Sequence, residues 1–101
     1  MWEKIKKLSN NGNIALWGAA GKGVSLANII DPNCELIECL IDLNPKKWGK
    51  FISGTGHEII NHSEIEKWEI KTAIIMNPNY YDEIKKLMKN KNIKINLVTL
   101  Q

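Results

Sequence analysis

The sequence predicts an α/β domain of three layers, in which a small, mostly parallel sheet lies between helices on both of its faces. Short, continuous apolar runs, at residues 14–17 and 36–41, are typical of strands that are buried on both faces. Segments with helical spacing of apolar residues alternate with these runs, and strands that alternate with helices form parallel sheets. A glycine-rich turn, Gly18 to Gly23, directly follows the first run, which makes the predicted design Rossmann-like.

The first half of the chain supplies two helices beside these strands. A helix is expected within residues 1–12, where apolar residues recur at helical spacing until Asn10-Asn11-Gly12 end it with turn chemistry. The helix after the glycine turn stops at Asp31-Pro32, and the second buried strand ends at Asp42. The first strand is expected at the centre of the sheet, with the glycine turn, Asp42 and residues 77–79 along one rim.

Strands and helices continue to alternate in the second half of the chain. At a length of 101 residues, we expect residues 1–101 to form a single domain. Asn79 is expected to cap the last helix, and Tyr80 to begin its buried stripe. In order, we expect a long loop, a short strand, a brief helix begun by a capping box at Ser63, a buried strand, a helix and an edge strand, at residues 44–56, 58–60, 63–68, 72–76, 79–88 and 93–97.

Composition excludes several classes of function. The net charge of +3 is too small to indicate a nucleic-acid partner. All 14 basic residues are lysine, which excludes a site built on arginine forks. No stretch reaches the roughly 20 apolar residues of a membrane helix, and the N-terminus lacks the pattern of a signal peptide. We therefore expect a cytoplasmic protein with no nucleic-acid or membrane partner.

Two cysteines and two histidines follow the spacing C-x4-C-x17-H-x4-H, from Cys34 to His62. The gap between the pairs exceeds that of common zinc fingers, and Cys39 falls inside a predicted strand. A buried cysteine and loop histidines are therefore expected, and no metal. His57 has the chemistry of an acid or base, but a lone histidine in a loop is more often solvated.

The glycine turn is the main candidate for binding. Its order, G-x-x-G-x-G, differs from the dinucleotide G-x-G-x-x-G and from the Walker loop. Glycines between a buried strand and a helix let the backbone approach an anion, which the helix N-terminus then holds. The cation of Lys22 in the first helical turn opposes the helix dipole unless an anion lies nearby. Gly18, Gly21, Lys22 and Gly23 therefore form a candidate phosphate-binding loop; alternatively, the glycines only permit tight packing.

Asp42 ends the second strand, where a carboxylate receives ribose hydroxyls in dinucleotide-binding domains. The equal alternative is an Asx turn with Asn44-Pro45. No nucleophile–base pair, carboxylate dyad or metal cluster is apparent, so the candidate site has no recognisable catalytic residue.

Together these motifs resemble the C-terminal domain of sugar C-methyltransferases. Ile14 to Gly23 resembles the opening of that domain, and Asp42 to Gly49 matches its D-x-N-P-x-K-x-G segment. Residues 53–59 match its P-G-T-x-I-P-I segment except at Ser53 and His57-Glu58. Residues 77–84 match its P-W-N-x-x-x-E-I segment, with Asn77-Pro78 in place of Pro-Trp.

The resemblance implies a domain on the substrate side of an S-adenosylmethionine-dependent enzyme that methylates a carbon of a nucleoside-diphosphate sugar. It implies no cofactor on this chain, and a methyltransferase domain in cis or in trans that binds S-adenosylmethionine and carries the catalytic groups. It also implies that the turn from Gly18 to Gly23 faces the diphosphate, with Asp42 and Asn44 at the rim. Two alternatives stay open: a stand-alone regulatory module that binds NAD or a coenzyme-A-type ligand, and a purely structural interaction domain.

Overall fold

The computed structural model describes residues 2–99, so Met1, Leu100 and Gln101 of the predicted domain lie outside the described residues. Three α-helices and five strands alternate as the sequence predicts, with three short 3-10 turns between them. In chain order they are α1 (Trp2–Ser9), β1 (Asn13–Trp17), α2 (Gly21–Ile30), β2 (Ile37–Ile41), η1 (Pro45–Lys47), β3 (Ile59–Ile60), η2 (His62–Glu64), β4 (Ile70–Ile75), η3 (Pro78–Tyr80), α3 (Tyr81–Asn90) and β5 (Asn96–Thr99).

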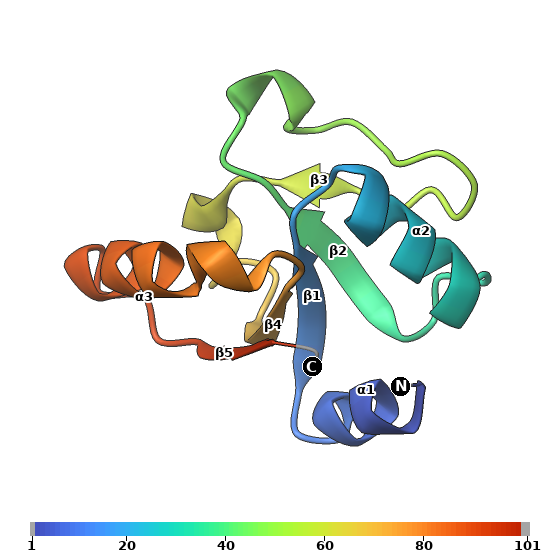
Figure 1. Ribbon diagram of the computed structural model, residues 1–101, viewed down its shortest axis with the longest axis horizontal. Coiled ribbons are helices and arrows are strands. Elements are labelled where there is room, and N and C mark those ends of the chain that lie inside the picture. The colour runs from blue at the N-terminus through green and yellow to red at the C-terminus, as the bar shows by residue number, and fades with distance from the viewer. Residues whose placement is uncertain (1, 100–101) are drawn as a thin grey trace.

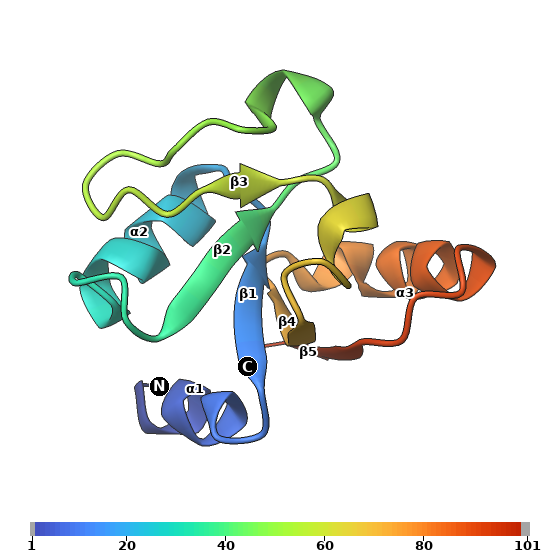
Figure 2. The same cartoon turned by 180° about the vertical axis from the view of Figure 1, so that it is seen from behind.

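The five strands form one parallel sheet in the order β3-β2-β1-β4-β5, with β1 at its centre (Figures 1 and 2). The sequence predicts this central place for the first strand, and the strand order confirms it. The chain leaves β1 towards β2 on one side and returns to β4 on the other. The crevice where the order reverses lies beyond the carboxyl end of β1, which is where ligands bind in sheets of this kind.

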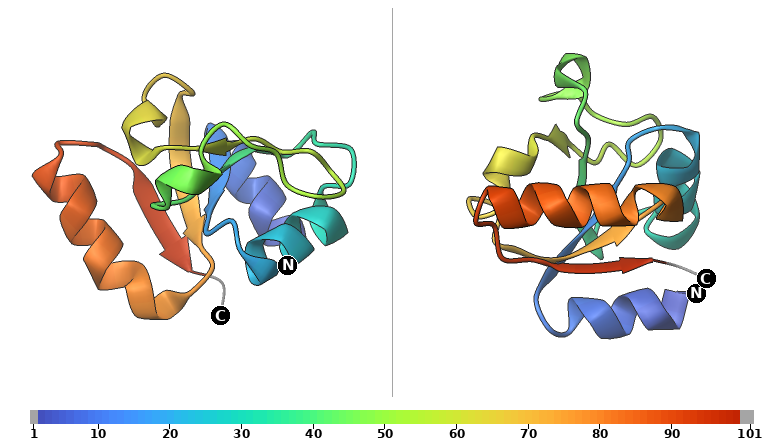
Figure 3. Two further views of the ribbon diagram at one scale, coloured as in Figure 1. Left: turned by 90° about the horizontal axis from the view of Figure 1, so that it is seen from above. Right: turned by 60° about the vertical axis from the view of Figure 1, so that its left-hand side comes forward.

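Helices cover both faces of the sheet, which confirms the three layers (Figure 3). Side chains alternate between the two faces along β1, as the pleat requires. Ile14 and Leu16 pack in a core with residues of α1 and α2, whereas Ala15 and Trp17 pack in a second core with residues of α3. Each large aliphatic side chain that is buried here stabilises the fold by about 1.5–3 kcal/mol.

Local turn chemistry differs from the prediction at two helix starts. The side chain of Asn61, and not a capping box at Ser63, accepts the N–H of Ser63 and begins the 3-10 turn η2. Asn77, and not Asn79, is the capping residue of η3, which precedes α3. Because α3 begins only at Tyr81, Tyr80 falls outside its buried stripe and is 53% exposed, so its predicted core position is wrong.

The long loop after β2 is ordered by a small hairpin, which Figure 2 shows arching beside α2 before the chain enters β3. Phe51 and Glu58 form an antiparallel bridge, and the N–H of Ile52 donates to the carbonyl of His57. The side-chain amide of Asn28 on α2 donates to the carbonyl of Ser53 at 3.0 Å. The hairpin is thus fixed to α2 and not free in solvent.

A second anchor of this hairpin is fully buried. His57 is 1% exposed, which corrects the expectation of a solvated histidine. Its Nε2 lies 2.9 Å from Oδ2 of Asp31, and its Nδ1 lies within hydrogen-bonding distance of the hydroxyl of Thr55. Asp31 also accepts three backbone N–H groups, which come from residues 35, 36 and 37. This one carboxylate therefore joins the end of α2, the start of β2 and the hairpin.

Candidate functional site

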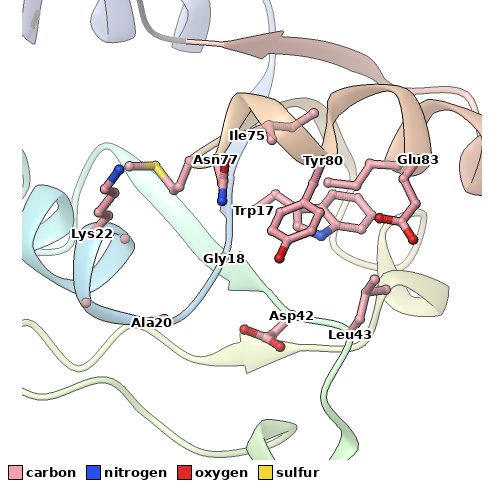
Figure 4. Close-up of a pocket in the computed structure, with 14 residues that line it drawn as sticks. Trp17, Gly18, Ala20, Lys22, Asp42, Leu43, Ile75, Asn77, Tyr80 and Glu83 are labelled. Carbon is pink, nitrogen blue, oxygen red and sulfur yellow. The ribbon is translucent and has the colours of Figure 1, made fainter.

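A pocket of about 710 Å³ opens at the carboxyl ends of β1, β2 and β4, where the rim was predicted (Figure 4). Its lining comes from the turn between β1 and α2, from Asp42 and Leu43 after β2, and from residues after β4 that continue into α3. Elements far apart in the sequence meet here because parallel strands place all their carboxyl ends at one edge of the sheet.

The N-terminus of α2 presents unpaired donors to this pocket. Within residues 2–99, no hydrogen bond uses the backbone N–H groups of Ala20, Gly21, Lys22 or Gly23. The capping residue Ala20 supplies no side-chain acceptor, and the first turn of the helix holds no acidic residue. The exposed side chain of Lys22 adds a cation to this positive end of the helix dipole. The local field therefore favours an anion at this end of the pocket.

The three glycines of the turn differ in why a residue without a side chain stands there. Gly18 has a φ of +123°, which side-chain-bearing residues rarely adopt. A Cβ on Gly23 would overlap the carbonyl oxygen of Gly18, so this glycine permits the close packing of α2 on β1. A Cβ on Gly21 would meet no atom within 4 Å. Gly18 and Gly23 therefore serve the fold, whereas Gly21 leaves open space at the pocket rim.

Asp42 is held firmly at the centre of the rim. Its Oδ2 accepts the N–H of Ala19 at 3.0 Å, and its Oδ1 accepts the N–H of Asn44 at 2.9 Å. The second bond forms the Asx turn that the sequence left as one alternative. The side chain is 17% exposed and lines the pocket, and a carboxylate has about four acceptor positions. Asp42 therefore retains acceptor capacity for a ligand hydroxyl.

The segment after Asp42 folds back onto the turn. Lys47 lies with its Nζ 3.8 Å from Oδ2 of Asp42 and donates to the carbonyl of Ala19 at 3.4 Å. The indole N–H of Trp48 donates to the carbonyl oxygen of Asp42 at 2.7 Å. Asn44, predicted as a rim residue, is not among the lining residues; its side chain accepts the N–H of Lys46 and caps η1. Its role toward a ligand stays a prediction.

Sequence reasoning missed the other end of the pocket. Leu43, Tyr80 and Glu83 line it together with the edge of Trp17, and Leu43 and Tyr80 are about half exposed. In Figure 4 these side chains lie at the end opposite Lys22, with Gly18 and Asp42 between the two ends. Leu43 lies two residues after the end of β2, which was an available signal, but periodicity assigned Tyr80 to the core.

The four residues of the zinc-like spacing do not converge. Within residues 2–99, no group of three or more histidine, cysteine, aspartate or glutamate side chains is placed to hold a metal ion. Cys39 is buried and Cys34 is exposed. His57 lies beside Asp31 at the opposite end of α2 from the pocket, so it does not face the candidate site.

The two thiols should differ in reactivity. Burial raises the pKa of Cys39 to about 12, with a further contribution from Glu38, so its thiolate is scarce at neutral pH. We expect a disulfide reagent to modify one thiol, Cys34, in the folded protein and two after denaturation. A Cys34→Ser variant, with no rapidly reacting thiol, is the control; rapid modification of that variant would contradict the buried position of Cys39.

A family model matches nearly the whole chain. The model is described as the C-methyltransferase C-terminal domain, and it matches residues 1–96. The chain belongs to this family. The membership confirms the resemblance carried by the glycine turn, the Asp42 segment and the residues after β4. No curated protein is similar enough in sequence to match.

Solved structures show the same fold. A Rex-family repressor, RSP, has a TM-score of 0.59 at 15% identity, over 98% of this chain and 60% of its own. RSP in complex with β-NADH gives 0.58 at 15% identity, over 88% of this chain and 53% of its own. RSP with β-NAD+ and operator DNA gives 0.60 at 15% identity, over 98% and 56%. The chain thus spans little more than half the length of these neighbours, and the likeness establishes the α/β fold alone.

No helix within residues 2–99 is long and apolar enough to cross a membrane.

Proposed function

We propose that this C-methyltransferase C-terminal domain is the substrate-side module of a sugar C-methyltransferase and binds the diphosphate of a nucleotide sugar. The observation that carries the proposal is the set of unpaired N–H groups from Ala20 to Gly23, beside Lys22 and inside the pocket. The domain binds and orients the substrate but performs no chemistry alone. Catalysis belongs to a methyltransferase domain, joined in cis or in trans.

The donor set supports a phosphate ligand over S-adenosylmethionine. Backbone N–H groups at a helix N-terminus and an ammonium group suit phosphate oxygens, which carry negative charge. S-adenosylmethionine has no phosphate and bears a sulfonium cation, which the same groups repel. We therefore place that cofactor, which supplies the methyl group, on the methyltransferase domain. Both cysteines are free thiols, which fits a protein of the reducing cytoplasm.

An amide NMR titration tests the proposal. Thymidine and uridine diphosphates and a nucleotide sugar are expected to shift the signals of Gly18, residues 20–23 and Asp42, whereas S-adenosylmethionine leaves them unchanged. Lys22→Ala should weaken diphosphate binding about three- to tenfold, as expected for one exposed charge. Gly21→Leu should block binding sterically, because its side chain enters the open space at the rim.

Lys46→Ala is the matched control. Lys46 is also an exposed lysine, but it lies outside the pocket lining, so its loss should leave the affinity unchanged. Equal losses for the two lysine variants would indicate binding to net charge and not to the turn. No shift with any phosphate ligand would contradict the proposal and favour a purely structural interaction domain.

A second candidate is a regulatory module that binds NAD or a coenzyme-A-type ligand. Solved structures of RSP, which share the α/β fold of this chain, contain β-NADH and β-NAD+. In dinucleotide-binding domains of this class, the glycine-rich turn after the first strand receives the pyrophosphate. The same titration separates the two functions. A response to NADH that exceeds the response to nucleotide sugars would favour the regulatory module.

A further inference from the structure

We propose that the open edge of β5 binds an extended, acidic segment of a partner protein, which adds to the sheet as a further strand. This inference does not depend on the proposed function, because β5 lies at the edge of the sheet and contributes no residue to the pocket lining. Figure 3 shows β5 as the outermost strand, with α3 along one of its faces.

The two edges of the sheet differ in whether the chain covers them. At the β3 edge, the N–H of Gly49 donates to the carbonyl of Ile59, and the N–H of Ile59 donates to the carbonyl of Lys50, each at 2.8 Å. At the other edge β5 pairs with β4, and within residues 2–99 no backbone hydrogen bond joins β5 to a further element. β5 also contains no proline, lysine or bulge, which are features that keep open edges from pairing. This edge is therefore suited to the addition of a strand.

The direction of the backbone groups in β4 follows from one hydrogen bond. The N–H of Met76, directly after β4, donates to the carbonyl of Trp17 in β1 at 3.1 Å. Along a strand, the N–H and C=O groups of successive residues point alternately to the two sides. The backbone groups of Ala73 and Ile75 therefore point away from β1 and towards β5.

The same alternation identifies the free groups of β5. Ala73 is the register partner of Leu97, and in a parallel pair a residue bonds to the two neighbours of its register partner. Asn96 and Val98 therefore bond to β4. The N–H and C=O groups of Leu97 and Thr99 point outward, where the backbone of an added strand would meet them.

The charge beside this edge favours an acidic partner. Residues 81–99, which include α3 and β5, hold five lysines and two acidic residues, whereas the rest of the chain holds nine of each. The whole net charge of +3 therefore belongs to this segment. Its two acidic residues, Asp82 and Glu83, lie in the first turn of α3, and Glu83 lines the pocket. The remainder of the segment is purely basic.

Two of these lysines project towards the open edge. Successive residues of an α-helix are rotated by about 100°, so Lys85 and Lys89 lie on the side of α3 opposite Glu83. Because Glu83 faces the pocket, at the middle of the sheet, the opposite side of α3 is the side of the β5 edge. Both lysines are exposed. A twofold dimer through this edge would bring the same positive surface together, so the charge favours an acidic partner over a second copy.

Binding of a short labelled peptide that alternates glutamate with valine, followed by fluorescence anisotropy, tests the proposal. We expect this peptide to bind at least about threefold more tightly than the same peptide with lysine in place of glutamate. At a peptide concentration about tenfold above its Kd, amide hydrogen exchange at Leu97 and Thr99 should slow about tenfold. Exchange at Asn96 and Val98, which already bond to β4, should change less.

Thr99→Pro removes one outward N–H group. We expect peptide binding to weaken about two- to tenfold, as for the loss of one hydrogen bond. The β4 ladder is retained, because proline is tolerated where an edge N–H faces solvent. Thr99→Val is the matched control, since it keeps the N–H group and should leave the affinity unchanged. Circular dichroism of both variants checks that the fold is retained.

A pair of double variants tests the charge. Lys85→Gln with Lys89→Gln should weaken peptide binding about two- to tenfold. Lys46→Gln with Lys67→Gln lowers the net charge equally at exposed lysines outside the α3 and β5 segment, and should change the affinity little.

Several results would overturn the inference. Equal affinities for Thr99→Pro and Thr99→Val, with unchanged exchange at Leu97 and Thr99, would show that no strand is added. Equal affinities for the glutamate and lysine peptides would contradict the acidic partner. A dimer in sedimentation with slow exchange at Leu97 and Thr99 in the absence of peptide would show that a second copy covers the edge. Binding of heparin but not of the glutamate peptide would indicate a site for polyanions. The diphosphate titration reports on the glycine turn and Asp42, so either proposal can fail without the other.

Discussion

Asp31→Ala is expected to lower the free energy of unfolding by about 3–5 kcal/mol, because it removes a buried carboxylate and leaves several hydrogen-bond donors without their acceptor. The Asp31 carboxylate is 4% exposed and accepts bonds from three backbone N–H groups and from Nε2 of His57. Alanine leaves all four donors without this acceptor. The bonds from Ile37 and His57 are buried, so water does not readily replace the carboxylate there. Urea unfolding followed by circular dichroism measures the loss.

The control for Asp31 is an aspartate with no such contacts. Asp82→Ala removes an exposed carboxylate from the first turn of α3, and it should cost less than about 1 kcal/mol. The loss of stability in Asp31→Asn should fall between those of the two alanine variants. The amide of asparagine keeps one acceptor oxygen, but its NH2 group cannot accept the remaining N–H bonds. Equal urea midpoints for Asp31→Ala and Asp82→Ala would contradict the role assigned to Asp31.

The same carboxylate makes stability depend on acid pH. Burial raises the pKa of the Asp31 carboxyl, but the bonds from Ile37, Glu35, His57 and Leu36 together lower it below its ordinary value of 3.8. A carboxyl with a depressed pKa stabilises the fold fully above its unfolded value, and this stabilisation is lost as pH falls through the folded value. We expect stability to decline as pH falls below the ordinary value of 3.8, and less steeply in Asp31→Asn.

Gly23→Ala is the second change expected to have a large effect, with a loss of at least about 3 kcal/mol, at the upper end of the overpacking range. The added Cβ would overlap the carbonyl oxygen of Gly18 and lie 3.1 Å from its carbonyl carbon. That carbonyl cannot easily yield, because Gly18 already has a φ of +123° and its N–H donates to Ile41 at 2.7 Å. Helix α2 would have to move away from β1.

Gly21→Ala is the matched control in the same turn. Gly21 has no unusual φ and its Cβ would meet no neighbour, so alanine should leave stability unchanged or raise it by up to about 1 kcal/mol. Urea unfolding of both variants gives the comparison. Similar stabilities for Gly23→Ala and Gly21→Ala would show that the close approach of α2 to β1 is not needed.

Gly21 and Gly23 have different roles, which the sequence pattern did not distinguish. The pattern G-x-x-G-x-G could signify a phosphate cradle or only tight packing, and the structure gives each glycine one of these reasons. Gly23 packs α2 on β1, whereas Gly21 leaves space at the rim beside the unpaired N–H groups. A ligand-binding test should therefore use Gly21 and Lys22, whose replacement is expected to leave the fold intact.

The sequence by itself determined the α/β class, the central place of β1 and the rim that carries the glycine turn and Asp42. These follow from local information: apolar runs, helical spacing and the rule that parallel strands end at one edge. The motifs at that rim also indicated the methyltransferase family, which the match over residues 1–96 confirms.

Tertiary structure decided what depends on contacts between distant residues. Asp31 and His57 are 26 positions apart, and no local pattern predicts that they meet, so the histidine was expected in solvent. Tyr80 does not lie in the core, contrary to the prediction, because it belongs to the 3-10 turn η3 and α3 begins only at Tyr81. The two kinds of helix have different numbers of residues per turn, so α-helical spacing does not describe the position of Tyr80. Periodicity describes one element at a time, whereas a buried pair and a pocket wall are properties of several elements packed together.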